Sequence, residues 1–177
     1  MYEGRLVRLR ERRPDEEAPV CAKWLNDPDT ARRISAGPMP ITPEAERDYI
    51  LKHTGDSFAV ETLDGGRYIG NCSFFDVNPR ARSCQVGWLI GDPAMRGKGY
   101  GSDMIITLLK FLFRQRNMLR VGLEVFAYNA EAVRLYERLG FVREAIYREP
   151  VFADGKYWDE YAYGILREEF EERYGDR

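Results

Sequence analysis

Apolar and polar residues alternate in several stretches of the chain, and this period of two is typical of strands that bury one face. Residues 4–12, GRLVRLRER, form the first such stretch. In residues 119–126, the odd-numbered positions are expected on one face and the even-numbered ones, including Glu124, on the other. The pattern predicts further strands within residues 57–77, 83–91 and 143–166, with turns at LDGG and ADGK.

Apolar residues three or four positions apart predict helices between these strands. In residues 15–27, the apolar face is expected to contain Val20, Trp24 and Leu25. Residues 41–55 have a Thr-Pro pair that suits a helix start, and a glycine at the end is expected to close the helix.

Two more helices are expected in the second half of the chain. Residues 104–117 are strongly apolar, and residues 129–141 run from an Asn129 N-cap to a stop at Gly140. The resulting order is strand, helices, antiparallel meander, then strand–helix–strand–helix–strand. It predicts an α/β (α+β) fold, a single domain over residues 1–177. Its sheet would be mixed, mostly antiparallel and flanked by helices, with the parallel pair around a glycine-rich turn.

Composition narrows the class of protein. The 177 residues are 44% hydrophobic and 32% charged, as in globular domains, and the formal net charge of -2 argues against broad nucleic-acid binding. No apolar run is long enough for a bilayer and the first residues lack a signal-peptide centre, so we predict a cytoplasmic protein without a membrane partner. Three separated cysteines and the single His53 form no metal or Ser-His-Asp pattern, so no metal is expected.

The segment AMRGKGYGSD, residues 94–103, places three glycines at alternate positions beside two cations, directly before an apolar helix. The first N–H groups of a helix lack internal partners and carry the positive end of its dipole, and glycines let a ligand approach the backbone. Phosphate oxygens suit such a site. The spacing matches neither the nucleoside-triphosphate loop nor the dinucleotide fingerprint. A plain tight turn with surface cations is the alternative.

Further residues accompany this turn. Arg96-x-x-Gly99-x-Gly101 follows a strand and opens a helix, Asn129 comes later, and LYERLGF follows at residues 135–141. Together they resemble the GNAT superfamily of acyl-CoA-dependent N-acetyltransferases, most closely the branch with ribosomal-protein N-terminal and spermidine acetyltransferases. The likeness extends along most of the chain. It implies the GNAT acyl-CoA N-acyltransferase fold, with acetyl-CoA as cosubstrate and no metal.

The resemblance also assigns the coenzyme site. The loop's backbone amides would hold the pyrophosphate, and the main chain at the end of the preceding strand would bond the pantetheine arm. The asparagine would both cap its helix and touch the coenzyme. The residues concerned are Arg96, Gly97, Lys98, Gly99, Tyr100, Gly101 and Ser102 in the loop, Leu89, Ile90 and Gly91 in the strand, and Asn129.

Tyr136 lies where the family places a general acid. A phenol there would protonate the thiolate that leaves when an amine attacks the thioester, with a strand N–H stabilising the oxyanion. From the helical pattern alone, Tyr136 is a core residue on the face of Ala132 and Leu139. Glu124 could hold a water that takes the amine's proton; an exposed strand carboxylate is the equal alternative, and relatives often have no dedicated base.

The acceptor site is the part that the sequence defines least. The resemblance points to residues 24–49 and to FADGKYWDE, residues 152–160. Carboxylates there suit an amine, although each is more typical of a solvated surface acid. They are Glu44, Asp48, Asp159 and Glu160, while Tyr157 and Trp158 would line the pocket or pack the sheet.

We therefore predict an acetyl-CoA-dependent N-acetyltransferase that acetylates a primary amine, either a protein N-terminus or a small amine, by direct attack on the thioester. A polyamine or aminoglycoside-type acetyltransferase is the alternative. A non-catalytic acyl-CoA-binding module is disfavoured by the presence of Tyr136, and a nucleotide-binding regulator by the missing Lys-Ser/Thr pair. No nucleic acid partner is expected, and the sequence leaves monomer and homodimer open.

Overall fold

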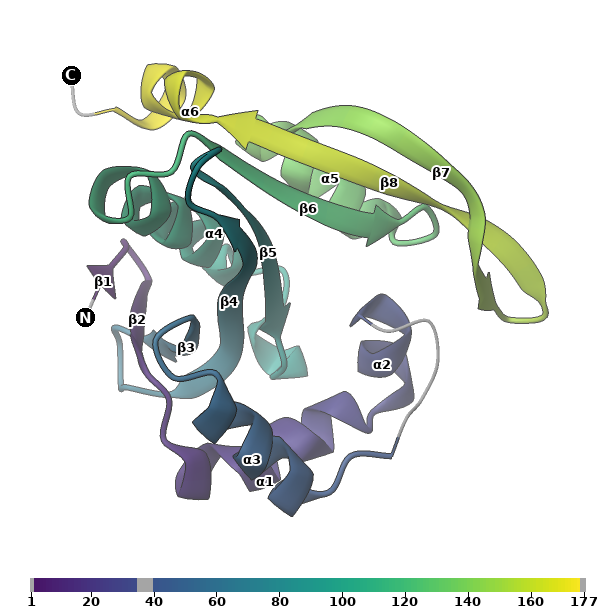
Figure 1. Ribbon diagram of the computed structural model, residues 1–177. Coiled ribbons are helices and arrows are strands. Elements are labelled where there is room, and N and C mark those ends of the chain that lie inside the picture. Colours follow the sequence, from purple (N-terminus) through teal and green to yellow (C-terminus); the bar gives the residue numbers. More distant parts are fainter. Residues whose placement is uncertain (1, 35–39, 176–177) are drawn as a thin grey trace. The chain divides into compact units, whose positions relative to one another are not determined.

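The computed structural model describes residues 2–34 and 40–175 (Figure 1). The strands are β1 (Tyr2–Glu3), β2 (Val7–Glu11), β3 (Ser57–Thr62), β4 (Tyr68–Asn78), β5 (Ser83–Ile90), β6 (Arg120–Phe126), β7 (Val142–Ala153) and β8 (Lys156–Leu166). The helices are α1 (Pro14–Leu25), α2 (Pro28–Ile34), α3 (Pro43–Lys52), α4 (Tyr100–Lys110), α5 (Ala130–Leu139) and α6 (Arg167–Tyr174). A 3₁₀ turn (Pro93–Met95) precedes α4, and a π-helical turn (Phe111–Gln115) follows it.

The strands form one sheet in the order β1-β2-β3-β4-β5-β6-β8-β7. β2 pairs antiparallel with β1 and β3, β3 with β4, and β8 with β6 and β7. β5 and β6 form a parallel pair, with Ser83–Gln85 beside Arg120–Gly122. These two strands flank the glycine-rich turn in the chain, so the prediction of a mostly antiparallel sheet with its parallel pair around that turn is confirmed.

Backbone contacts divide the chain into two compact units. The first comprises Met1–Phe74 and Gly87–Leu108, and the second comprises Phe75–Val86 and Leu109–Arg177. The first unit therefore contains β1 to β3, α1 to α3 and the glycine-rich turn, while β6 to β8, α5 and α6 belong to the second. β4, β5 and α4 each contribute residues to both.

The start of α3, in the first unit, shows the predicted capping chemistry. The Thr42 side chain accepts a hydrogen bond from the N–H of Ala45 at 3.2 Å, and Pro43 occupies the first turn, as predicted. The helix ends earlier than predicted, at Lys52 with His53 as C-cap. Gly55 lies in the following turn, where its φ of 98° requires a residue without a side chain.

α1 buries a different face from the predicted one. Val20 is 38% exposed, whereas the buried face contains Glu17 together with small side chains. Glu17 lies inside because Arg10 Nη1 lies 2.6 Å from its Oε1 and Arg12 Nε lies 2.6 Å from its Oε2. The small buried residues are Ala18, Cys21 and Ala22.

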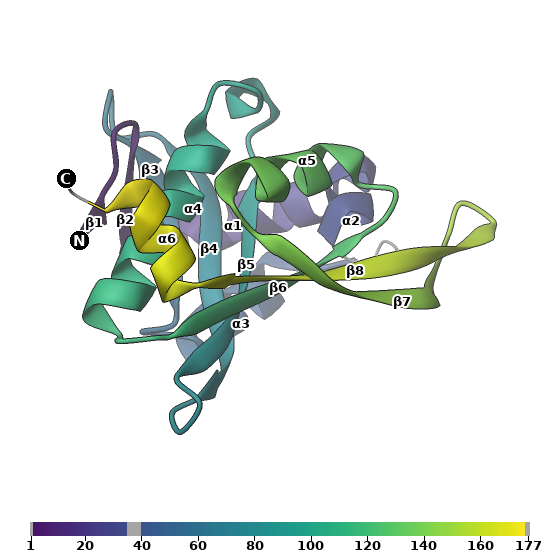
Figure 2. The same cartoon turned by 90° about the horizontal axis from the view of Figure 1, so that it is seen from above.

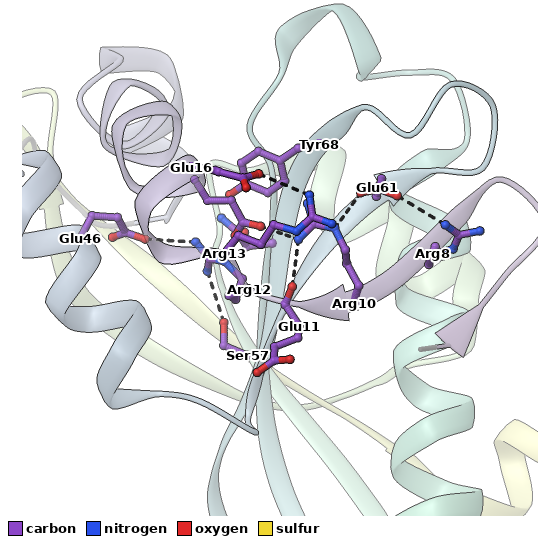
Figure 3. A network of polar contacts seen from close by, with 12 residues as sticks. Arg8, Arg10, Glu11, Arg12, Arg13, Glu16, Glu46, Ser57, Glu61 and Tyr68 are labelled. Carbon is purple, nitrogen blue, oxygen red and sulfur yellow. Dashed lines mark hydrogen bonds and ion pairs between the residues drawn. The ribbon is translucent and has the colours of Figure 1, made fainter.

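These charges belong to a buried ion-pair network that joins β2, β3, α1 and α3 (Figure 3). Arg10 Nε lies 2.7 Å from a carboxylate oxygen of Glu61 on β3. Arg12 reaches the α3 residue Glu46 and the Ser57 hydroxyl, both at 3.4 Å. Every one of these buried charges has an opposite partner, which offsets part of the cost of removing it from water.

In the second unit, β7 and β8 form a long two-stranded ribbon that ends in a turn at Asp154 and Gly155 (Figure 2). Both turn residues have positive φ, of 53° and 78°, as the predicted ADGK turn requires. Within β6 the odd-numbered residues are buried and Glu124 is exposed, as the predicted alternation requires, whereas Gly122 on the even-numbered face is also buried. Leu119 is 44% exposed, because it lies just before the strand begins.

α4 begins at Tyr100, earlier than the predicted apolar segment, so the glycine-rich turn leads directly into its first turn. Its core side chains include Met104, Ile105 and Leu108, which are at most 1% exposed. The sequence pattern did not indicate α2, α6 or the short β1. Within residues 2–34 and 40–175, no helix combines the length and apolar character needed to cross a membrane.

Candidate functional site

The glycine-rich turn is an exposed loop that connects a 3₁₀ turn to the start of α4. The Asp92 side chain accepts from the N–H of Ala94 at 3.0 Å and starts the 3₁₀ turn. Gly97 and Gly99 then adopt left-handed φ values of 72° and 87°, and α4 follows at once. Both glycines are exposed, so the N–H groups at this helix start lie where an anion could reach them.

The only acid in the first turn of α4 is engaged elsewhere in the first unit. The Asp103 carboxylate accepts hydrogen bonds from three consecutive backbone amides, those of residues 5–7, at 2.7 to 3.0 Å. A side chain at Gly4 would meet this carboxylate at 2.3 Å. The backbone N–H groups of residues 5–7 therefore compensate the negative charge of Asp103 at the start of α4. Sequence reasoning missed this role, although an acid after Gly-x-Gly was a visible signal.

Lys98 and Arg96 place their charges differently. Lys98 is exposed in the loop, as expected for a residue that could approach phosphates. The Arg96 guanidinium instead donates from Nε to the carbonyl of Ile90 at 3.1 Å and from Nη2 to Thr30 Oγ1 at 2.9 Å. Nη2 also lies 3.4 Å from the Gly91 carbonyl oxygen.

The end of β5 is fixed through its main chain. The N–H of Gly91 donates to the carbonyl of Ile69 on β4 at 2.9 Å. A side chain at Gly91 would overlap the Trp24 ring at 2.1 Å, and one at Gly70 would lie 2.0 Å from the carbonyl oxygen of Leu89. Glycine is needed at both positions because ring and backbone approach so closely. Leu89, Ile90 and Gly91 thus form a rigid strand end directly before the loop.

Asn129 is the N-cap of α5, as predicted. Its Oδ1 accepts a hydrogen bond from the N–H of Ala132 at 3.3 Å. The cap uses the carbonyl oxygen and does not involve the side-chain NH₂ group. At the other end, Gly140 closes α5 with a φ of 98°, and its N–H bonds back to the carbonyl of Glu137. Both predicted ends of this helix are confirmed.

Tyr136 lies on the buried face of α5 and is 8% exposed. Its ring centroid is 6.0 Å from Phe141 and 6.2 Å from Tyr163 on β8. Tyr163 in turn donates from its hydroxyl to Glu137 at 2.8 Å. Burial and this carboxylate raise the pKa of Tyr163 to about 12. The ring of Tyr136 is thus held in one orientation, which both a packing role and a proton-donor role require.

Glu124 and Glu160 lie on the same face of the β6–β8 pair. Phe126 pairs directly with Glu160, and Glu124 precedes Phe126 by two positions, so both carboxylates project from one side. Glu124 is exposed and Glu160 is half-buried. Burial raises the pKa of Glu160, and the negative charge of Glu124 raises it further. A carboxylate with a raised pKa is a better proton acceptor, so Glu160 is a candidate base beside the predicted Glu124.

Aromatic side chains stand near these carboxylates in the chain. Trp158 donates from Nε1 to the Ala153 carbonyl at 3.1 Å, and its ring lies 5.3 Å from that of Tyr128. The Lys156 ammonium lies 3.7 Å from the Trp158 ring centroid, so this ring already accommodates a cation. Tyr157 points to solvent and is 63% exposed.

The predicted acceptor residue Asp159 on β8 accepts a hydrogen bond from the N–H of Glu149 at 3.0 Å. The remaining predicted acceptor residues belong to the first unit. Trp24 stacks on Tyr68 with ring centroids 4.9 Å apart, while Glu44 and Asp48 are exposed on α3. Residues 35–39 of the predicted acceptor segment lie outside the described residues. Across the part of the chain that the structure describes, no three His, Cys, Asp or Glu side chains are grouped as a metal site.

The predicted site residues thus fall into two sets. The first unit brings Ile90, Gly91 and Arg96 together by hydrogen bonds, next to the glycine loop. The second unit contains Asn129 and Tyr136 on α5 and Glu124 on β6. Sequence reasoning missed Thr30, which is buried, because its partner Arg96 is 66 positions away and no local pattern links them.

Comparison with known proteins shows which family this chain resembles. The model of a family described as "Acetyltransferase (GNAT) domain" matches residues 7–142. A prophage-derived uncharacterized N-acetyltransferase of Bacillus subtilis (strain 168) is 39% identical over 151 residues, covering 84% of this chain and 85% of the relative. The spermidine N(1)-acetyltransferase of Vibrio cholerae is 32% identical over 123 residues, covering 67% and 70%.

The fold is also found among solved structures. A crystal structure of spermidine N-acetyltransferase from Vibrio cholerae, in complex with CoA and spermine, matches with a TM-score of 0.82. The match covers 93% of this chain and 97% of that chain at 24% sequence identity. At this identity the likeness speaks for the fold.

Proposed function

Because the chain belongs to the GNAT acetyltransferase family, we propose that it transfers an acetyl group from acetyl-CoA to a primary amine that attacks the thioester directly. The family, the fold and the enzyme class are those that the sequence motifs implied. The chain is an acetyl-CoA-dependent N-acetyltransferase. The acceptor amine and the role of each site residue are part of the proposal.

The observation that carries the donor half of this proposal is the loop before α4. Gly97 and Gly99 have left-handed backbones and are exposed, and a helix begins immediately after them. Backbone amides from Gly97 to Ser102 would hold the pyrophosphate, with Lys98 adding a charge, whereas the N–H of Arg96 already donates to the carbonyl of Pro93. The main chain of Leu89, Ile90 and Gly91 would bond the pantetheine arm. Asn129 would contribute its side-chain NH₂ group, which the helix cap does not use.

In the chemical half, Tyr136 protonates the departing thiolate. The neutral amine nitrogen forms a bond to the thioester carbon, the carbon–sulfur bond breaks, and the phenol proton goes to the sulfur. The proton that the nitrogen loses on becoming an amide returns to the Tyr136 oxygen and restores the phenol. The amine must lose a proton to become a nucleophile. Glu124, or Glu160 with its raised pKa, would take that proton directly or through a water.

Among acceptors, a polyamine or similar small polycation is the one that the structural features support best. Two carboxylates, Glu124 and Glu160, share one face of the β6–β8 pair. Carboxylates bind ammonium ions through charge-assisted hydrogen bonds. A relative named for spermidine acetylation supports the same choice. A protein N-terminus is the second candidate, because the exposed aromatic Tyr157 could accept a peptide.

The test has two arms. Thermal unfolding with acetyl-CoA, ATP or NAD identifies the donor, because a ligand at one hundred times its Kd stabilises the folded state by about 2.7 kcal/mol. Released thiol then identifies the acceptor in a panel of spermidine, peptides with Ser or Ala N-termini, and aminoglycosides. We expect stabilisation by acetyl-CoA alone and thiol release with spermidine. If saturating acetyl-CoA does not raise the unfolding temperature, the donor assignment is refuted. If thiol is released only with peptides, a protein N-terminus replaces the polyamine as the proposed acceptor.

A further inference from the structure

Arg96 belongs to the loop of residues 96–102, which is called the coenzyme loop below. Its side chain contacts other parts of the first unit. Its guanidinium has three acceptors: the carbonyls of Ile90 and Gly91 at the end of β5, and the hydroxyl of Thr30 in α2. The planar fork of an arginine can serve several acceptors at once, which a lysine ammonium on a single flexible stem does less well. One side chain therefore links a helix, a strand end and the loop.

Thr30, which accepts the hydrogen bond from Arg96, is itself held in place by Asp27. It is fully buried, and both its N–H and its hydroxyl donate to Asp27 Oδ1 at 2.9 Å. The hydroxyl can thus give its proton to Asp27 and accept from Arg96 at the same time. The two hydrogen bonds from Thr30 lower the pKa of Asp27, and the Arg96 charge lowers it further. The chain of contacts runs from a carboxylate through a hydroxyl to a guanidinium and on to two carbonyls.

We propose that Arg96 is a positioning residue that couples α2 to the coenzyme loop, and that its side chain is not a phosphate ligand. This inference rests on the proposed function, in which the loop binds the coenzyme pyrophosphate. Contacts with the phosphates then fall to the loop amides and to Lys98. α2 lies within the segment assigned to the acceptor, so a shift of that helix changes how the strand end and the loop present their backbone groups to coenzyme A.

Two further points support this assignment. Arg96 donates to two main-chain carbonyls, and because the donor is charged, these bonds anchor the strand end more strongly than neutral ones would. The backbone of the same residue is also tied down, because its N–H donates to the carbonyl of Pro93 at 3.3 Å. Side chain and main chain together fix the entry to the loop before Gly97.

Binding of coenzyme A to four single variants tests the proposal. Thr30→Val keeps the shape of the side chain but removes the hydroxyl, and it cannot touch a phosphate. Arg96→Gln removes the fork, and Arg96→Lys keeps the charge without the fork. Lys98→Gln is the matched control for a phosphate-contacting cation in the same loop. Circular dichroism and urea unfolding confirm that each variant is folded.

We expect Thr30→Val and Arg96→Gln each to weaken coenzyme A binding by about 5- to 150-fold, the usual range for coupled sites. The Thr30→Val/Arg96→Gln double variant should bind no more weakly than Arg96→Gln alone, because both changes break one link. Arg96→Lys should not restore affinity. The dependence of Kd on salt should decrease in Lys98→Gln and stay at the wild-type value in Arg96→Gln.

Wild-type affinity in Thr30→Val, or restored affinity in Arg96→Lys, would overturn the proposal and return Arg96 to the phosphates. If Arg96→Gln does not fold, Thr30→Val and Arg96→Lys decide the question by the same criteria. A wild-type protein that fails to bind coenzyme A would instead refute the proposed function. The two failures are therefore distinguishable.

Discussion

Arg12 and Glu17 form an ion pair of 2.6 Å in which both side chains are almost completely buried, at 4% and 2% exposure. The pair joins the residue that follows β2 to α1, and Arg10 of β2 bonds to the other oxygen of the same carboxylate. A carboxylate shared by two arginines is costly to bury, and its partners offset part of that cost. Its contribution therefore appears only when one partner is removed.

The change Glu17→Gln should lower the free energy of unfolding by about 3–5 kcal/mol, because two buried guanidinium groups lose their shared counter-charge. Urea unfolding measures this loss. The matched control is Asp15→Asn, which breaks the exposed Arg47–Asp15 pair of the same 2.6 Å separation. Water screens that pair, so its loss should leave stability unchanged. Equal effects of the two substitutions would contradict the assignment of the energy to burial.

The same pair explains why the sequence predicted α1 but not its buried face. Spacing alone favoured Val20 as a core residue, since it is apolar and Glu17 is charged. Burial of Glu17 depends on Arg10 and Arg12, which lie on a strand outside the helix, so a helical pattern cannot indicate it. By contrast, the caps Thr42, Asn129 and Gly140 were predictable, because capping is local chemistry between residues a few positions apart.

Gly97→Ala should weaken coenzyme A binding by about ten-fold, roughly the loss of one hydrogen bond to a charged group. The reason is the left-handed φ of 72°, which alanine resists, so the loop amides lose their orientation. Gly155→Ala is the control, since Gly155 has a φ of 78° and both positions have open space where the added methyl group would lie. Isothermal titration should show reduced affinity only for Gly97→Ala, and equal reduction in both would rule out a specific role for the loop.

The three cysteines should make the folded protein less stable at alkaline pH. Burial raises the pKa of Cys84 to about 11 and that of Cys21 to about 12, and it raises the pKa of Cys72 as well. Above pH 9, the unfolded chain loses thiol protons that the folded chain keeps, so deprotonation favours unfolding. Each thiol should cost on the order of 1 kcal/mol per pH unit in this range.

Urea unfolding between pH 7 and 10.5 measures this effect. Stability should be constant below pH 8 as far as the thiols are concerned, and then fall as the pH rises toward the folded-state values. Replacement of Cys84 by Ala removes one group and should reduce the alkaline slope by its share. A slope that does not change in this variant would show that the thiol is not buried. A thiol reagent should likewise leave the native protein unmodified at pH 8.

The candidate site shows where sequence reasoning reached its limit. The glycine loop and the helix carrying Tyr136 could be predicted because their motifs lie within a few residues of one another. The contacts of Arg96 with Thr30 and of Asp103 with residues 5–7 could not, because each joins segments more than sixty positions apart. Long-range hydrogen bonds leave no period or spacing in the chain. The motif therefore predicts the loop, whereas the contacts of the Arg96 side chain are visible only in the structure.

Glu124→Gln should lower the pKa of Glu160. The like charge of Glu124 raises that pKa in addition to burial, so its removal lets Glu160 ionise more easily, while burial still holds the pKa above its ordinary value. Carboxyl ¹³C titration by NMR follows Glu160 directly. Glu172→Gln, an exposed change on α6, is the control and should leave the titration in place. An unmoved Glu160 titration in Glu124→Gln would mean that the two carboxylates do not interact.

Tyr136→Phe should lower kcat by about ten- to a thousand-fold, near the range of a single acid–base group, because the departing thiolate loses its proton donor. The ring and its contacts with Phe141 and Tyr163 remain. Tyr163→Phe is a close control: it removes a buried hydroxyl in the same aromatic cluster, whose partner is Glu137. That variant should lose about 1 kcal/mol of stability and keep its kcat. Steady-state thiol release with an accepted amine measures the kcat of both variants. An unchanged kcat in Tyr136→Phe would leave Tyr136 as a packing residue.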